Sequence, residues 1–243
     1  MDKVVVVTGA SRGIGAATAV LLASQGYAVV VNYLRNHSAA DEVVKKIRAQ
    51  GGQAISVQAD VADEHQVTEL FQQANQVFGP VTHLVNNAGI LFTQAKLTEI
   101  SAERFQTVMN TNVLSCFLCC KEALKTMSAG SAIVNVSSAA SRIGAPFEYI
   151  DYAASKGAMD SLTKGLSLEV AEIGIRVNAV RPGCIYTDMH ADGGEPDRVD
   201  RLSAHLPLKR GGTPEEVANA IAWLLSDEAS YATGSFIDLA GGR

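Results

Sequence analysis

Two tyrosines lie three positions apart in the segment EYIDYAASK, residues 148–156. A tyrosine exchanges protons poorly at neutral pH because its unperturbed pKa is about 10, so it needs a neighbour that stabilises the phenolate. On a helix that neighbour lies one turn on, at position i+4. This position holds Ala153 for Tyr149, but it holds Lys156 for Tyr152, and a cation can favour the phenolate. The spacing indicates Tyr152 as the candidate acid–base residue, although a YxxxK pattern alone often arises by chance.

A glycine-rich segment near the N-terminus has the composition of a phosphate-binding loop. TGASRGIG, residues 8–15, follows an apolar run and precedes a helical pattern. Its glycines permit a tight turn, close approach of the backbone to a pyrophosphate, and close packing of the next helix on the sheet. That helix directs its N-terminus at the anion, so an ordinary glycine-rich turn is disfavoured. We expect cofactor contacts from Gly9, Ser11, Arg12, Gly13, Ile14 and Gly15.

Short β-branched runs alternate with longer helical patterns along the chain. Because the apolar runs are continuous, they predict a parallel sheet covered by helices on both faces. Glycines at 26, 51, 79 and 174 stand where helix C-caps are expected, and Thr213-Pro214 is typical of a helix start. We predict an α/β, Rossmann-type doubly wound sheet of about seven strands. The predicted strands are 4–7, 28–31, 54–57, 82–85, 132–136, 175–180 and 235–239, and the helices are 14–25, 38–50, 64–78, 103–127, 152–172 and 214–226.

Composition restricts the class of protein. The 243 residues are 47% hydrophobic and carry no Pro-rich, Ser-rich or charged linker, so we expect a single domain over 1–243. A net charge of −5 gives no basic excess for nucleic acid, and no apolar run reaches the length of a signal peptide or membrane span. Cys116, Cys119 and Cys120 suggest buried positions on a helix rather than a metal or disulfide site, and a cytoplasmic location.

Six motifs follow one another in an order typical of one enzyme family. They are TGASRGIG, Asp60-Val61, NNAG at 86–89, Ser138, YAASK at 152–156 and RPG at 181–183. The chain resembles a classical short-chain dehydrogenase/reductase over essentially its whole length. It is similar to the branch that contains glucose dehydrogenases and 3-oxoacyl carrier-protein reductases. The resemblance implies an enzyme that interconverts a carbonyl and a secondary alcohol by hydride transfer with a nicotinamide cofactor.

The resemblance also implies roles for the motif residues. Tyr152 would be the acid in reduction and the base in oxidation, while Lys156 would hold the nicotinamide ribose and lower the tyrosine pKa. Moving that pKa from about 10 towards 7 requires roughly 4 kcal/mol. Ser138 would orient the carbonyl oxygen, with Ser137 as the rival because strand neighbours face opposite ways. Asn112 matches the anchor of a water relay to the lysine, and a helix-kink or capping role is its alternative.

Further positions match the cofactor contacts of the family. Asp60 would bind the adenine amino group, with Val61 beside it, and Asn86 would be structural. The positions expected at the ribose are Asn87, Ala88 and Gly89, and those expected at the nicotinamide carboxamide and pyrophosphate are Pro182, Gly183, Ile185 and Thr187.

The end of the second predicted strand bears on the choice between NAD and NADP. Sites that prefer NAD usually place an acid there to bind the ribose 2′-hydroxyl. Tyr33 occupies this position, and no Asp or Glu occurs between Asp2 and Asp41. Arg12 and Arg35 offer guanidinium groups that suit a 2′-phosphate, unless both are solvated surface charges. We predict that NADP(H) is preferred over NAD(H).

The segment of about 188–210 corresponds to the mobile substrate lid of the family. It is polar, with Met189, Leu202 and Leu206 as its main apolar residues, which argues weakly against a deep steroid or long-acyl pocket. His190 and His205 either contact a small-molecule carbonyl or alcohol substrate or are surface bystanders.

Other segments bear on whether the protein docks a carrier protein and whether it forms an oligomer. Carrier-protein reductases tend to have basic residues in the stretches that correspond to 126–132 and 169–175, and here neither stretch has a basic patch. The helical patterns at 103–127 and 152–172 are apolar on more than one face, and relatives are commonly tetramers, so we expect a homotetramer. A non-catalytic NADP(H)-binding sensor is the alternative function, but sensors typically lose the tyrosine or lysine that this chain keeps.

Overall fold

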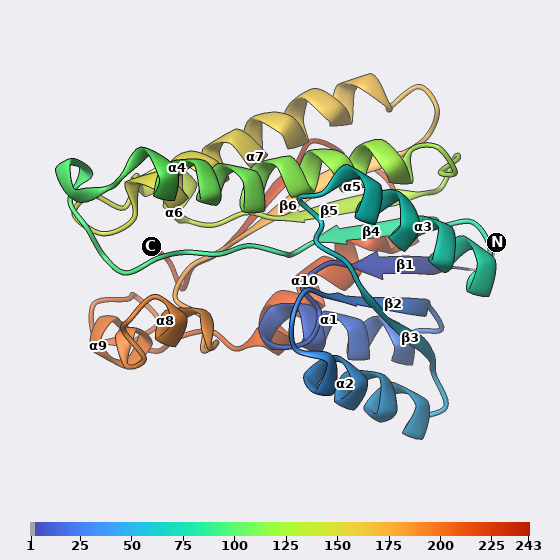
Figure 1. The fold of residues 1–243 in the computed structure, drawn as a ribbon, viewed down its shortest axis with the longest axis horizontal. Helices are drawn as coiled ribbons and strands as arrows, with labels where there is room; N and C mark the ends of the chain where they lie inside the picture. The colour runs from blue at the N-terminus through green and yellow to red at the C-terminus, as the bar shows by residue number, and fades with distance from the viewer. Residues whose placement is uncertain (1–2) are drawn as a thin grey trace.

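A seven-stranded parallel β-sheet forms the centre of the computed structural model, which describes residues 3–243 (Figure 1). The strand order is β3-β2-β1-β4-β5-β6-β7, so the direction of winding reverses between β1 and β4. Val6 in β1 pairs with Val30 of β2 and with Leu84 of β4. The predicted fold class is confirmed. The strands are β1 (Val4–Val7), β2 (Ala28–Tyr33), β3 (Gln53–Gln58), β4 (His83–Asn86), β5 (Ala132–Val136), β6 (Arg176–Pro182) and β7 (Phe236–Leu239).

Helices cover both faces of this sheet, which is why its central strands are apolar throughout. Alternate residues of β1 enter two separate cores, Val5 and Val7 in one and Val4 and Val6 in the other. One face is covered by α1 (Gly13–Ser24), α2 (His37–Ala49) and α10 (Pro214–Leu225) (Figure 1). The other face is covered by α3 (Glu64–Phe78), α4 (Ala102–Met109), α5 (Ser115–Ala123) and α7 (Ile150–Glu169).

The carboxyl ends of the strands point to one end of the molecule, where short helices gather (Figure 1). These helices belong to loops that follow β4, β5 and β6, so they can enclose a site at that edge. No helix within residues 3–243 combines the length and apolarity needed to cross a bilayer. The short elements in these loops are η1 (Leu97–Glu99), α6 (Ala140–Ile143), α8 (Met189–Asp192) and α9 (Arg198–Ser203). A further short element, η3 (Asp227–Ala229), follows α10 at the amino end of the strands, where Asp227 pairs with Lys3.

The predicted helix at 103–127 is wrong in one respect, because it is not continuous. A π-helical turn, η2 (Asn110–Leu114), separates α4 from α5, and α5 already ends at Ala123. The side chain of Asn112 bonds to groups outside its own helix, and π-helical turns often occur where a helix serves a site. Three cysteines of α5, at 116, 119 and 120, are buried as expected.

Helix ends follow the predicted signals with one exception. Thr213 caps α10 in a capping box with Glu216, and Pro214 is the first helical residue. Gly79 is the C-cap of α3 at φ +86°, and Gly26 and Gly51 have positive φ just beyond α1 and α2. Gly174 does not cap α7, which ends at Glu169 with Val170 as its C-cap; Gly174 forms the turn that leads into β6.

Candidate active site

Tyr152 and Lys156 lie one turn apart near the start of α7, as their spacing predicts. The Lys156 Nζ atom is 5.6 Å from the centroid of the Tyr152 ring and donates a hydrogen bond to the Val136 carbonyl at 2.8 Å. Tyr149 is instead the N-cap of α7, with its ring 5.1 Å from the Arg198 guanidinium carbon. The structure therefore pairs Tyr152, and not Tyr149, with the lysine.

The protonation of this pair differs from the expectation. Burial raises the pKa of Tyr152 to about 12, and a hydrogen bond with Ser138 lowers it by less. Burial also lowers the pKa of Lys156 to about 8. We expected the lysine to lower the tyrosine pKa, but its ammonium is directed at Val136 and desolvation of the phenol dominates. The phenol therefore holds its proton at neutral pH and is a donor.

The two serines at the end of β5 face different ways. Ser137 is buried and donates to the Lys156 carbonyl at 3.3 Å. Ser138 lies beside the Tyr152 hydroxyl, and its Oγ accepts a hydrogen bond from the Ala140 amide at 3.1 Å. This arrangement favours Ser138 as the partner of a substrate oxygen.

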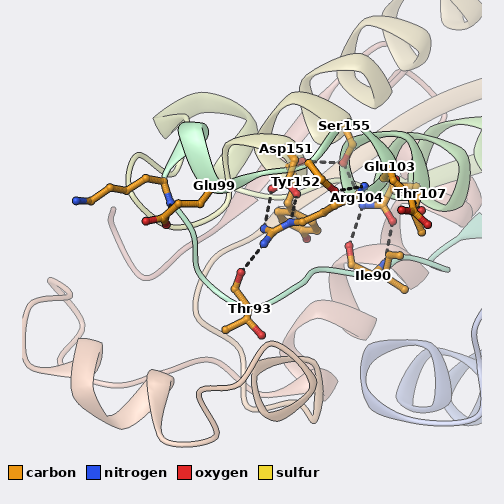
Figure 2. Close-up of polar contacts among 12 residues, drawn as sticks. Ile90, Thr93, Glu99, Glu103, Arg104, Thr107, Asp151, Tyr152 and Ser155 are labelled. Carbon is orange, nitrogen blue, oxygen red and sulfur yellow. Dashed lines mark hydrogen bonds and ion pairs between the residues drawn. The ribbon is translucent and has the colours of Figure 1, made fainter.

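Asn112 links the loop after β4 to α7. Its Oδ1 accepts from the Ile90 amide at 2.8 Å, and its Nδ2 donates to the Ile90 carbonyl and to Ser155 Oγ, both at 3.0 Å (Figure 2). In the described part of the chain, no direct hydrogen bond joins Asn112 to Lys156. A Cβ on Gly89 would lie 3.3 Å from Asn112 Oδ1 and 3.6 Å from Lys156 Nζ, so this glycine keeps the space between them open.

The glycine loop needs its glycines for conformation and for space. Gly9 and Gly13 have φ values of +60° and +56°, which disfavour other residues. A Cβ on Gly15 would be 2.5 Å from Asn87 Nδ2 and 2.7 Å from the Gly9 carbonyl oxygen. Asn87 braces this turn, because its Nδ2 donates to the carbonyls of Thr8 and Gly9 at 2.9 and 3.0 Å.

The start of α1 is arranged to receive an anion. Its N-cap is Arg12, whose side chain makes no capping bond, and its first turn has no acidic residue. By contrast, Asp63 caps α3 and Thr213 caps α10 through their own side chains. The first amides of α1 therefore remain available to an external phosphate, which fits the pyrophosphate of a dinucleotide.

The positions expected at the adenosine end lie along the neighbouring strand ends. The Asp60 carboxylate accepts from the Ala62 amide at 2.9 Å, and Val61 beside it is buried. Tyr33 is packed in the core, with its hydroxyl 2.7 Å from His37 Nδ1, so no carboxylate occupies the end of β2. Ala88 donates its amide to Thr8 Oγ1 at 3.0 Å.

The two candidate phosphate-binding arginines have different surroundings. The half-exposed guanidinium of Arg12 pairs with Asp192 and lies 3.9 Å from Asp188, so it contacts the segment around α8. Arg35 is exposed, and no side-chain ion pair joins it to another of residues 3–243. The contact between Arg12 and the α8 segment was not predicted from the sequence.

A cavity of about 400 Å³ joins the candidate groups at the carboxyl edge of the sheet. It brings together Ser138, Tyr152 and Lys156 with two residues of the cofactor end, Ile14 and Asn87. Pro182, Gly183, Ile185 and Thr187 line it as well. Asp60, Tyr33 and Arg35 lie outside this cavity, as groups for the distant end of an extended cofactor would.

Much of the cavity wall was not expected. Leu91, Ile143, Pro146 and Arg198 line it, and no local pattern in the sequence singles them out. Tyr149 also lines the cavity, although the sequence offered it no catalytic role because Ala153 lies at position i+4.

The segment 188–210 contributes one side of the cavity. Met189, His190 and Leu206 line it, whereas His205 is exposed. The His190 ring donates from Nε2 to the Ile185 carbonyl at 3.1 Å, and burial lowers the pKa of His190. Its Nδ1 is buried and has no partner among the described residues.

Known proteins share both the sequence and the fold. Residues 9–243 match the family model described as Enoyl-(Acyl carrier protein) reductase. An uncharacterized oxidoreductase of Escherichia coli K12 is 61% identical over 99% of both chains, and glucose 1-dehydrogenase 2 of Bacillus subtilis 168 is 40% identical over 99% of this chain and 94% of its own. A short chain dehydrogenase from Burkholderia cenocepacia J2315, solved in complex with NADP, superposes with a TM-score of 0.91 at 33% identity, covering 99% of this chain and 97% of the other.

Proposed function

Because the chain belongs to the short-chain dehydrogenase/reductase family, we propose that it is an NADP(H)-dependent oxidoreductase that interconverts a carbonyl and a secondary alcohol. The observation that carries this proposal is the single cavity that joins Ser138, Tyr152 and Lys156 to the loop residues beside the glycine turn. The uncapped N-terminus of α1 and the crowded glycines fit a pyrophosphate. When bound, the nicotinamide supplies the hydride for reduction.

The chain's own groups supply the proton and orient the substrate. Ser138 donates a hydrogen bond to the carbonyl oxygen, which places that oxygen beside the Tyr152 hydroxyl. As the carbonyl carbon receives the hydride, Tyr152 gives its proton to the oxygen and becomes a phenolate. A phenol with a pKa of about 12 is protonated at neutral pH, which supports the acid role in reduction.

The Lys156 ammonium, 5.6 Å from the centroid of the Tyr152 ring, would reduce without outweighing the desolvation cost of the phenolate that the proton transfer leaves behind. This ammonium lies on the face of α7 that carries Tyr152, and it retains its charge below about pH 8. Lys156 would also hold the nicotinamide ribose, and the open space at Gly89 between it and Asn112 suits a water that returns the proton. Asn112 would anchor this water by accepting its hydrogen bond at Oδ1, which faces the space at Gly89, because both Nδ2 hydrogens are donated to Ile90 and Ser155.

Tyr33, the last residue of β2, supports a preference for NADP(H) over NAD(H). A buried tyrosine replaces the usual acid, and two arginines lie in the loops that would face the ribose phosphate. A relative of the same fold was solved with NADP. A 2′-phosphate would compete with Asp192 for Arg12.

The substrate is a small carbonyl compound with an apolar body. A cavity of about 400 Å³ is near the lower end of the range for ligand pockets, and the nicotinamide must share it. Leu91, Ile143 and Met189 supply apolar wall. Docking of an acidic carrier protein is disfavoured, because 126–132 has no basic residue and 169–175 carries Glu169 and Glu172.

The segment 188–210 would act as the substrate lid, and the protein would be cytoplasmic. Exposed Phe105, Phe117 and Leu168, on α4, α5 and α7, support a homotetramer built through these helices.

The test follows NADPH and NADH oxidation in parallel with small carbonyls: sugars, short β-ketoesters, diketones, quinones and aromatic aldehydes. We expect turnover with one class, faster with NADPH. Faster turnover with NADH would contradict the cofactor proposal. Tight NADPH binding without turnover of any class would favour the alternative, a non-catalytic sensor.

A further inference from the structure

Asp151, the residue before Tyr152, is a buried carboxylate in the first turn of α7. It is 1% exposed, and both its oxygens accept hydrogen bonds from Arg104 of α4 (Figure 2). Arg104 Nε donates to Oδ2 at 2.7 Å, and Nη2 donates to Oδ1 at 3.3 Å. A guanidinium that binds both oxygens of a carboxylate fixes orientation as well as distance. The turn of helix that carries Tyr152 is therefore attached to α4 in one orientation.

The same guanidinium also holds the loop that follows β4. Its third donor, Nη1, bonds to the Thr93 carbonyl at 2.8 Å (Figure 2). The central carbon of the guanidinium lies 5.4 Å from the centroid of the Phe92 ring. Arg104 thus joins three segments that are distant in sequence: the 90–95 loop, α4 and α7. Burying a carboxylate and a mostly buried arginine costs desolvation energy, so the pair is weak evidence for a gain in stability. What the pair does provide is a fixed geometry between the three segments.

The 90–95 loop is attached to α7 at a second point, through Asn112, which bonds to Ile90 and Ser155. Between the two attachments lies Leu91, which lines the cavity. A Cβ on Gly193 would be only 2.2 Å from Leu91 Cδ1, so the loop packs directly against the segment around α8. The two attachments reach α7 one residue before Tyr152 and one residue before Lys156.

We propose that Arg104 and Asp151 form a positioning pair that sets the Tyr152 hydroxyl and the Leu91 wall of the cavity relative to each other. The inference rests on the proposed function, because it concerns the proton donor of that reaction. Neither residue lines the cavity, so the pair acts through the residues it holds. A shift of about 1 Å between reacting groups can cost about a hundredfold in rate.

The test compares Asp151→Asn, which has the same shape without the charge, with the wild-type enzyme. Both are assayed with the carbonyl that the wild-type enzyme prefers. We expect kcat to fall about tenfold or more. The deuterium isotope effect with 4-deuterated NADPH should rise, because hydride and proton transfer become slower than product release. The Kd of NADPH, followed by nicotinamide fluorescence, should change less than about twofold, since cofactor binding does not use this pair. Arg104→Lys provides a second variant that keeps the charge but cannot bind both oxygens, and it should also lose kcat.

Arg176→Gln is the matched control for a purely structural effect. Arg176 is a partly buried arginine that bonds to the carbonyls of Leu224, Leu225 and Ser226 at the opposite edge of the sheet. The Arg176→Gln substitution should lower Tm without changing kcat or the isotope effect. If Asp151→Asn and Arg104→Lys lower Tm while kcat and the isotope effect stay at wild-type values, the positioning role is refuted. Absence of turnover by the wild-type enzyme itself would instead overturn the proposed function, and the positioning role with it.

Discussion

Replacing Lys156 by methionine should stabilise the fold at neutral pH while it removes activity. Lys156 is 3% exposed, and burial lowers its pKa from 10.5 to about 8. At 1.36 kcal/mol per pKa unit, this lowering corresponds to roughly 3 kcal/mol, which is the cost of keeping the buried cation below pH 8. Methionine removes this cost, although the Val136 carbonyl then loses its donor, which offsets about 1 kcal/mol or more.

The pH dependence isolates the lysine from the other effects of the substitution. Because the folded pKa lies below the unfolded one, the unfolded chain binds more protons between pH 8 and 10.5, and the free energy of unfolding rises with pH in that window. The difference between wild type and Lys156→Met should therefore shrink by about 2 kcal/mol from pH 8 to pH 10.

Urea unfolding of both proteins at one protein concentration, at pH 7, 8, 9 and 10, measures this difference. The m-values should agree, so that the comparison reports stability alone. A stability difference that stays constant from pH 8 to pH 10 would refute the claim that Lys156 is a buried cation with a lowered pKa.

Three further outcomes follow from the site. The rate constant for carbonyl reduction should fall above about pH 8, when Lys156 loses its proton, and a flat profile to pH 10 would contradict its role. Gly15→Ala should raise the Kd of NADPH at least about tenfold, because its Cβ would meet backbone and Asn87, whereas Gly165→Ala, where a Cβ meets open space, should leave that Kd unchanged. Arg12→Gln should weaken NADPH binding about tenfold without affecting NADH, as expected for the loss of a charged hydrogen bond to phosphate, and equal effects on both cofactors would argue against its 2′-phosphate role.

The parts of the fold that depend on local pattern could be predicted from the sequence. The α3 helix was predicted at 64–78 and lies at Glu64–Phe78, because an amphipathic pattern, an Asp63 cap and a terminal Gly79 agree there. The break at η2 could not be predicted, since the apolar pattern of 103–127 continues through it. It coincides with the hydrogen bonds that Asn112 makes to Ile90 and Ser155, which are distant in sequence.

The candidate site divides in the same way. Tyr152 and Lys156 were found because one helix places them together, and the glycine loop because its residues are adjacent in sequence. The pairing of Arg12 with Asp192 spans 180 positions, so no local sequence pattern predicts it. The direction of the Tyr152 pKa was also missed, because the sequence shows the lysine at i+4 but not the burial that outweighs it.

Tyr152→Phe is the sharpest test of Tyr152 as the proton donor, because the substitution removes one oxygen and leaves the ring in place. Binding of NADPH would be followed by nicotinamide fluorescence, and turnover by NADPH oxidation with the preferred carbonyl. We predict an NADPH Kd within about twofold of wild type and a loss of turnover of about a hundredfold or more, the size of a general-acid contribution. Turnover by Tyr152→Phe at the wild-type rate would contradict the assignment of Tyr152 as the proton donor.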